Sequence, residues 1–307
     1  MDDEPNVTYI TLNGYVDVHK YRYLYFCVMF MLFIVIICFN VTIVCLIWIH
    51  KNLHEPMYIF IAALLLNSVL YSTTMYPKLL IDFLSEKQII SYSACLFQFF
   101  LYYTLNSSEF LLLAAMSYDR YVSICKPLHY PNIMRKTNMS ILLFFSWSVP
   151  ACHVTVPVML SAETKLCNFT INGIFCNNAI YELQCIQSDA LNLYGLISLL
   201  DLVVLPMAFI VFTYTKIFII TNRSGKEVRK KAAETCLPHL LVLFSFFCLS
   251  VLVSIARVED NLPETARLIM TLQMFSYHAL FNPLIYGIKM KDISKHLRSL
   301  LCPSKII

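Results

Sequence analysis

Seven long apolar stretches, each close to the thickness of a bilayer, constrain this chain more than any other feature. A transmembrane helix needs roughly 20 mostly apolar residues. Only 14% of the 307 residues are charged, whereas a soluble domain carries about 25%. The stretches are 24–49, 57–82, 94–118, 140–160, 191–220, 236–256 and 264–288. We therefore expect an all-α membrane protein that folds as a seven-transmembrane helix bundle.

The segments between the stretches are short, so we expect one seven-helix domain over residues 1–307. Basic residues orient it: with the N-terminus outside the cell, 16 of the 23 Lys and Arg residues fall on the cytosolic side, as the positive-inside rule requires. The N-terminal segment 1–22 is then extracellular. The tail 289–307, with a short amphipathic helix, is then cytosolic. We expect a multi-pass protein of the plasma membrane that has the lipid bilayer as a partner and binds no nucleic acid.

Two other classes of membrane protein fit less well. A transporter is built from repeated halves or broken, glycine-rich helices, and this chain has five glycines and no repeat. An enzyme of the membrane-oxidase kind would use histidine clusters, of which His50 and His54 could form one. The eight histidines are otherwise scattered. We therefore expect no enzyme, and a transporter remains only a weak alternative.

Four cysteines fall on the extracellular side in this orientation. An even number of cysteines in an oxidising compartment indicates disulfides, and four cysteines allow three pairings. They are Cys95, Cys167, Cys176 and Cys185. Asn6 and Asn168 lie on the same side in N-x-T sequons, so both are expected to be glycosylated.

The end of the third stretch carries the longest motif, which reads MSYDRYVSICKPLHY over residues 116–130. An Asp-Arg pair alone could be a boundary arginine that reaches for water. The whole string, however, resembles the MAYDRYVAICxPLxY signature of odorant receptors in the rhodopsin-like G-protein-coupled receptor family. Further similar motifs are LHEPMY at 53–58, KAAETCLPHL at 231–240 and NPLIY at 282–286. The sequence LHEPMYIF resembles the corresponding motif of fish odorant receptors more than that of mammalian ones.

This resemblance implies a function, partners and residue roles. The chain would bind a small-molecule odorant and activate a heterotrimeric G protein of the stimulatory, olfactory type. The disulfides would join Cys95 to Cys176 and Cys167 to Cys185. A non-olfactory chemosensory receptor of the same class remains the alternative. Residues implied in activation and G-protein coupling are Asp119, Arg120, Tyr121, Tyr214, His239, Asn282, Pro283 and Tyr286.

One departure from the family pattern concerns ion binding. Ser68 stands where the family has an aspartate, so a sodium site would lack one carboxylate. Glu109 lies on the third stretch, and an intramembrane carboxylate is expected to face the helix bundle. Two interpretations of Glu109 remain open: a hydrogen-bond partner in helix packing, or a sodium ligand with Asn67, Ser68 or Asn282. No other cofactor is expected.

Candidate ligand contacts lie in the outer halves of the third, fifth and sixth stretches. Pockets for small ligands are mostly apolar with a few polar groups that orient the ligand. An inward Tyr or Ser is more often a packing residue, and a charged residue can pair with a neighbour or reach the interface. The candidates are Tyr102, Tyr103, Asn106, Ser107, Asp201, Ser250, Ser254 and Arg257.

Overall fold

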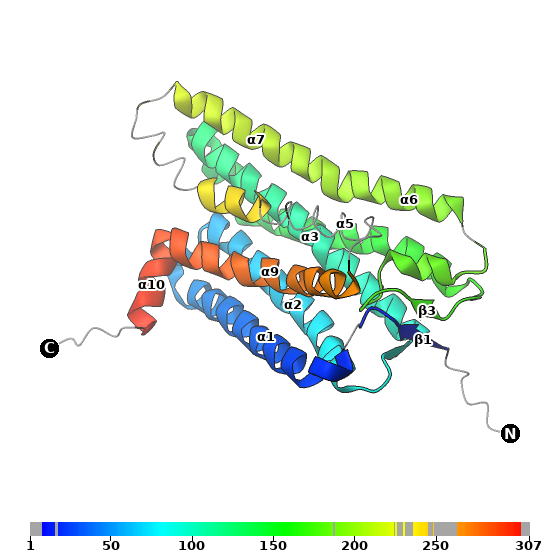
Figure 1. The fold of residues 1–307 in the computed structure, drawn as a ribbon. Helices are drawn as coiled ribbons and strands as arrows, with labels where there is room; N and C mark the ends of the chain where they lie inside the picture. Colours follow the sequence, from blue (N-terminus) through cyan, green and yellow to red (C-terminus); the bar gives the residue numbers. More distant parts are fainter. Residues whose placement is uncertain are drawn as a thin grey trace.

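Long helices lie side by side and form the bundle (Figure 1). This computed structural model describes residues 8–15, 18–186, 188–223, 225, 230, 236–244, 248 and 263–301. The long helices are α1 (Val18–Ile49), α2 (Pro56–Leu84), α3 (Tyr92–Cys125), α5 (Lys136–Ala162), α6 (Asp189–Leu199), α7 (Leu205–Asn222) and α9 (Glu264–Lys289). The shorter ones are η1 (Lys51–Leu53), η2 (Pro127–His129), α4 (Tyr130–Ile133), η3 (Asn178–Leu183), η4 (Leu200–Val204) and α10 (Lys291–Leu301).

Each expected span whose residues are all described is helical, as predicted. α6, the π-helix η4 and α7 follow one another without a break and together make the fifth span. Within the described residues, four helices are long and apolar enough to cross a membrane. α3 and α9 are of similar length but less apolar, and α3 carries many of the buried polar residues of the bundle. The sixth span, 236–256, is described and helical at 236–244.

Local sequence sets where several helices begin. Pro56 occupies the first turn of α2, where its missing N–H costs no hydrogen bond. The Ser91 hydroxyl accepts a hydrogen bond from the Ala94 N–H at 3.3 Å and caps the start of α3. Ser188 caps α6 in the same way, through the Leu191 N–H at 3.4 Å. Such caps satisfy backbone donors that a helix leaves open in its first turn.

α3 packs against α2, α5 and α7. Its buried residues include polar ones along the whole length, from Gln98 near the start to Arg120 near the end. In the orientation expected from the charges, the end of the bundle near β1 is the outer end and the end near α10 is the inner end. α3 therefore connects the two ends through the interior of the bundle.

The N-terminal segment forms part of a small sheet over the outer end, which the sequence did not predict. β1 (Tyr9–Leu12) lies between β2 (Ile89–Ser91), to which it is antiparallel, and β3 (Thr170–Ile171), to which it is parallel. Ile10 and Leu12 of β1 are buried. The three strands come from the N-terminal segment and two different loops, so they tie these parts together (Figure 1).

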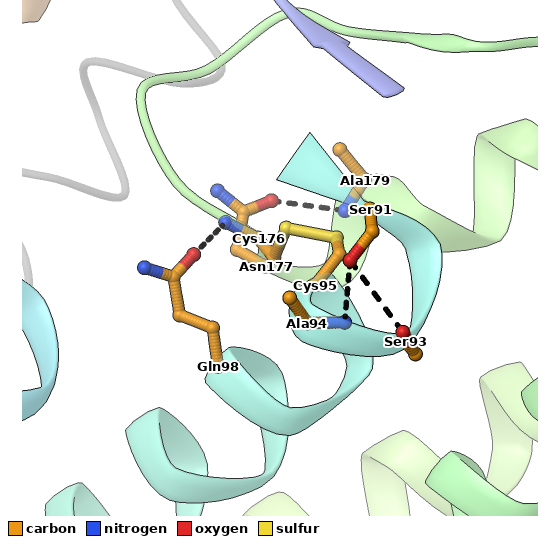
Figure 2. The surroundings of a disulfide bond; sticks show 8 residues. All are labelled: Ser91, Ser93, Ala94, Cys95, Gln98, Cys176, Asn177 and Ala179. Atoms are coloured by element: carbon orange, nitrogen blue, oxygen red, sulfur yellow. Dashed lines mark hydrogen bonds between the residues drawn. A yellow bond between two sulfur atoms is a disulfide. The ribbon is translucent and has the colours of Figure 1, made fainter. Parts of the chain in front are cut away.

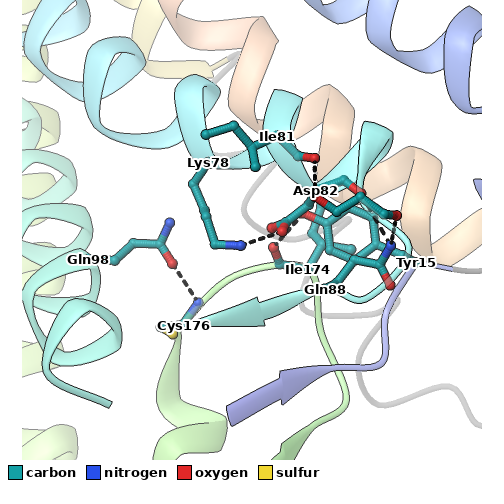
Figure 3. A network of polar contacts seen from close by, with 9 residues as sticks. Tyr15, Lys78, Ile81, Asp82, Gln88, Gln98, Ile174 and Cys176 are labelled. Carbon is teal, nitrogen blue, oxygen red and sulfur yellow. Dashed lines mark hydrogen bonds and ion pairs between the residues drawn. The ribbon is translucent and has the colours of Figure 1, made fainter. Parts of the chain in front are cut away.

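A polar network fastens this sheet to α2 (Figure 3). The Tyr15 hydroxyl lies 3.1 Å from Asp82 Oδ2 and 3.1 Å from the Ile174 carbonyl oxygen. Lys78 forms an ion pair with the same carboxylate. Burial, and secondarily Asp82, raise the pKa of the Tyr15 phenol well above its usual value. Tyr15 therefore stays protonated and remains a hydrogen-bond donor.

At the inner end, α10 is the short amphipathic helix expected in the C-terminal tail. Its Ile293 is buried against the bundle. The Tyr58 hydroxyl of α2 donates to Asp292 Oδ2 at 2.6 Å. The rings of His50 and His296 lie 3.9 Å apart between their centres. These contacts hold α10 across the ends of α1 and α2.

The outer sheet depends on a close backbone approach that only glycine allows. A Cβ on Gly14 would lie 2.5 Å from the Gly173 carbonyl carbon, so Gly14→Ala must push the N-terminal segment away. We expect Gly14→Ala to lower the stability of the purified receptor by about 1–3 kcal/mol, as overpacking does. The measurement is the thermal unfolding midpoint. Gly195→Ala is the matched control, because nothing lies within 4 Å of its added Cβ; equal midpoints for the two variants would contradict this role of Gly14.

Candidate ligand and activation sites

A disulfide joins the loop after α5 to the outer end of α3 (Figure 2). The structure forms Cys95–Cys176 and Cys167–Cys185, the two pairings implied by the family resemblance. The Cys176 N–H also donates to Gln98 Oε1 at 3.0 Å. Both Cys95 and Cys176 are fully buried. The loop is therefore fixed to α3 at one point by a covalent bond and a hydrogen bond.

This attachment places Phe175 in an aromatic cluster between α2, α3 and α9. The Phe175 ring centre lies 4.7 Å from that of Tyr102 and 5.0 Å from that of Phe275. Tyr71 of α2 lies 6.0 Å from Tyr102 and 6.4 Å from Phe275. The Tyr102 hydroxyl points to the Met274 sulfur at 3.8 Å. The cluster is apolar with a few polar atoms, which suits a small organic ligand.

The other candidates on α3 lie within the five residues that follow Tyr102. The Tyr103 hydroxyl accepts a hydrogen bond from the Asn178 N–H at 3.3 Å, so it faces the loop. Asn106 Nδ2 donates to the Tyr102 carbonyl at 2.8 Å. Ser107 is buried. The structure thus brings Tyr102 and Tyr103 to the underside of the loop, while Asn106 and Ser107 lie one turn deeper.

Among the remaining ligand candidates the structure describes Asp201 alone, and it is not part of this cluster. Ser250, Ser254 and Arg257 lie outside the described residues. Asp201 is exposed in η4, with exposed Leu200 and Val204 beside it.

Sequence reasoning missed Phe175, Tyr71 and Phe275. A signal for Phe175 existed, because it precedes Cys176, and the implied disulfide brings that position to α3. For Tyr71 and Phe275 no motif gave a signal, because an aromatic residue in a transmembrane helix is usually a packing residue.

Near the middle of the bundle, buried amides connect α2, α5 and α9 with α3 or with one another. Asn282 Nδ2 of α9 donates to Glu109 Oε1 at 2.9 Å and lies 3.4 Å from Ser68 Oγ. Asn67 Nδ2 donates to the Leu105 carbonyl at 2.9 Å, and its Oδ1 accepts from Trp147 Nε1 at 3.1 Å. A buried polar group stabilises only when it has hydrogen-bond partners. The contact with Asn282 therefore gives Glu109 a structural role that requires no ion.

At the inner end of α3, Asp119 and Arg120 form a buried ion pair. Arg120 Nε donates to Asp119 Oδ2 at 3.0 Å, and a second guanidinium nitrogen contacts the same oxygen. The Tyr130 hydroxyl donates to Asp119 Oδ1 at 2.9 Å. Burial, and secondarily Asp119, raise the pKa of Tyr130, so Tyr130 remains a donor. Removing one partner of such a pair leaves a buried charge without compensation.

Around this pair, side chains from three helices close the inner end. Tyr214 of α7 and Tyr286 of α9 are buried in one hydrophobic cluster with Met116 of α3. His239 Nδ1 lies 3.2 Å from the Tyr286 hydroxyl. Tyr121 packs against this cluster, while Pro283 lies within α9. Tyr121, Tyr214, His239 and Tyr286 therefore lie in or against one packed region, while Asn282 lies nearer the middle of the bundle beside Glu109.

The fold is that of a rhodopsin-type seven-helix receptor. The crystal structure of squid rhodopsin matches with a TM-score of 0.75, covering 94% of this chain and 83% of that one at 17% identity. At this identity the likeness concerns the fold, which confirms the expected seven-helix bundle.

Sequence relatives then define the family. A family model described as olfactory receptor matches residues 26–304. Human olfactory receptor 2T27 is 31% identical over 92% of this chain and 90% of its own length. Human olfactory receptor 13C2 is 32% identical over 91% of this chain and 90% of its own length. Human olfactory receptor 11A1 is 31% identical over 96% of this chain and 94% of its own length.

The chain belongs to the olfactory receptor family. It is an odorant receptor that acts through a G protein, and not an enzyme. These relatives are human, so the likeness to fish receptors stays a prediction.

The disulfide gives a first prediction at this site. We expect Cys95→Ser to prevent delivery to the cell surface, because the loop that carries Phe175 loses its attachment to α3. Loss of a native disulfide costs about 2–5 kcal/mol. The measurement is surface staining relative to total receptor. Cys152→Ser is the matched control, because Cys152 is an exposed cysteine outside any disulfide; normal staining of Cys95→Ser would refute the prediction.

Glu109 gives a second prediction, which separates its two interpretations. Gln can still accept the hydrogen bond from Asn282, so we expect Glu109→Gln to keep the parent's stability. Glu109→Leu deprives the Asn282 amide of an acceptor and should cost about 1–3 kcal/mol.

Ligand affinity measured in sodium and in N-methylglucamine buffers tests the ion site. A sodium site predicts a sodium dependence that Glu109→Gln removes. Equal affinities of the parent in both buffers would exclude the sodium site and leave the hydrogen-bond role.

Proposed function

We propose that this receptor binds a small, mostly apolar odorant under the loop at the outer end of α3 and activates a stimulatory G protein at the inner end. The observation that carries the proposal is the course of α3. Its outer half carries Tyr102 in the aromatic cluster, and its inner end carries the buried Asp119–Arg120 pair. One helix therefore contacts both the ligand site and the coupling site.

The aromatic cluster supports a ligand of this chemistry. Tyr102 and Phe175 offer apolar ring faces. An apolar ligand that packs against these faces is favoured, because it buries their apolar surface. The hydroxyls of Tyr71 and Tyr102 and the amide of Asn106 are polar groups that could orient a ligand oxygen. Ser107, one turn deeper, could add a hydroxyl. Ser250, Ser254 and Arg257 of the sixth span remain proposed contacts.

The packed inner end supports a two-state mechanism. The ion pair of Arg120 with Asp119 and the packing of Tyr214 and Tyr286 describe a closed inner end. An odorant can shift the equilibrium between the closed and the open state only to the extent that it binds the open state more tightly than the closed state. Opening would release Arg120 from Asp119, and a fork of five N–H donors would become available to the G protein.

The proposed orientation places the outer sheet outside the cell, in a plasma-membrane receptor with α10 in the cytosol. The excess of Lys and Arg at the inner end supports this orientation. The sequon residue Asn168 is exposed beside the outer sheet, so it is accessible for glycosylation in this orientation. Asn6, the other proposed glycosylation site, lies outside the described residues.

Substitutions at the ion pair test the coupling mechanism. We expect Arg120→Ala to bind odorant within several-fold of the parent but to produce no cyclic AMP, because the G protein loses its contact. Asp119→Ala should raise output without ligand, because Arg120 loses the partner that holds it in the closed state. The measurement is cyclic AMP normalised to surface receptor, with binding measured on the same cells.

The matched control is Arg135→Ala, which removes an exposed arginine at the same end of the bundle. It should signal like the parent. Normal output from Arg120→Ala at equal surface level would show that this coupling mechanism is wrong.

A further inference from the structure

A shallow groove follows the inner end of α5 on the side that faces away from the bundle. Its volume is about 630 Å³, within the range of sites that hold small ligands. Met139 and Ser146, which are buried, lie on the opposite side of this transmembrane helix. The groove therefore faces lipid. Its lining residues all belong to α5 and are exposed: Lys136, Thr137, Ser140, Ile141, Phe144 and Phe145.

Polar and apolar side chains of this groove are separated by depth. Lys136, Thr137 and Ser140 lie in the first two turns of α5. Phe144 and Phe145 lie about 12–13 Å further along the helix than Lys136, at a rise of 1.5 Å per residue. A bilayer has a polar headgroup layer on each side of its hydrocarbon core. The groove therefore offers polar groups at the level of the headgroups and aromatic rings at the level of the acyl chains.

The charge of the groove is positive. Residues 120–162 contain four Lys and Arg residues and no Asp or Glu. Within the described part of the chain, the Lys136 ammonium makes no ion pair or hydrogen bond. The cytosolic leaflet carries anionic phospholipids, which attract basic side chains near its surface. A headgroup with net negative charge is therefore complementary to this groove.

The hydroxyls of Thr137 and Ser140 are also available to a ligand. A Ser or Thr in a membrane helix often donates to the carbonyl four residues earlier. Ser148 and Thr155 of the same helix do so, at 2.8 Å and 2.7 Å. Among the described residues, Thr137 and Ser140 have no hydrogen-bond partner for their hydroxyls. Both hydroxyls can therefore donate to a phosphate oxygen.

We propose that this groove binds an anionic phospholipid of the cytosolic leaflet. The hydroxyls of Thr137 and Ser140 donate to the phosphate, which every phospholipid carries, and hold the headgroup beside Lys136. The lysine provides the preference for net negative charge. Phe144 and Phe145 contact the acyl chains. The assignment to the cytosolic leaflet rests on the orientation proposed above.

The inner end of α7 also carries an exposed lysine but lacks this combination. The Lys216 ammonium lies 5.6 Å from the centre of the Phe212 ring. The neighbouring Thr215 hydroxyl donates to the Val211 carbonyl at 2.7 Å. Lys216 is therefore a matched control for a basic residue at the inner end that does not belong to the groove.

The test measures lipid selectivity beside α5 by tryptophan fluorescence. The chain has two tryptophans, so Trp48→Phe leaves Trp147 of α5 as the reporter. Full-length receptor with this substitution is placed in phosphatidylcholine vesicles. These contain a minor share of either phosphatidylserine or phosphatidylcholine with the same brominated acyl chains. Bromine quenches tryptophan only at short range, so quenching reports the lipid beside α5. We expect phosphatidylserine to bind about fivefold more tightly than phosphatidylcholine.

Further substitutions assign this selectivity to the groove. Lys136→Gln should abolish the preference for phosphatidylserine, and Lys136→Glu should reverse it. Lys136→Arg, which keeps the charge, should keep the preference, and so should Lys216→Gln. Thermal midpoints of all variants check that the fold is intact.

Three outcomes would overturn the proposal. The first is equal quenching by the two brominated lipids. The second is an unchanged preference in Lys136→Gln. The third is an equal loss in Lys216→Gln, because the selectivity would then come from the overall positive charge of the inner end. Both leaflets of the vesicles have the same composition, so the result does not depend on the orientation of the receptor. A failure of the lipid site is therefore distinguishable from a failure of the proposed orientation.

Discussion

A transmembrane helix that carries buried polar residues along its length must satisfy them inside the protein, and this constraint on α3 shapes the rest of the structure. Near its outer end Gln98 accepts from the loop backbone. In the middle, Glu109 accepts from Asn282. Near its inner end, Asp119 meets Arg120 and Tyr130. Each contact holds another element against α3. The hydrogen bonds that satisfy the buried polar groups of α3 therefore also set the positions of the loop, of α9 and of the inner end.

The outer end shows how a covalent bond extends this arrangement to the loops. Cys95 fixes Cys176 to α3, which sets Phe175 against Tyr102. The N-terminal strand β1 then pairs with β3 of the same loop and with β2. The loop covers the aromatic cluster and is itself held by a sheet. The proposed odorant site would therefore depend on residues that lie outside the transmembrane spans.

The sequence predicted the helices and the motif sites because each leaves a local signal. An apolar run of transmembrane length indicates a span, and the string around Arg120 is specific to one family. The sheet over the outer end left no such signal, since β1 is four residues long and pairs with short strands from two loops. Nor could the sequence show that Asp201 faces outward, because a π-helix changes which residues share a face. The two disulfides were predicted because the family resemblance implied which cysteines pair, whereas the roles of the motif residues stay predictions.

The most direct measurement of coupling along α3 compares odorant affinity with and without a nucleotide-free stimulatory G protein, on purified receptor in lipid nanodiscs. If the outer and inner sites share one two-state bundle, bound G protein must raise odorant affinity by the same factor by which odorant raises G-protein affinity. We expect an increase of roughly 5–150-fold, the usual range of such coupling. Equal odorant affinity with and without the G protein would contradict the coupling.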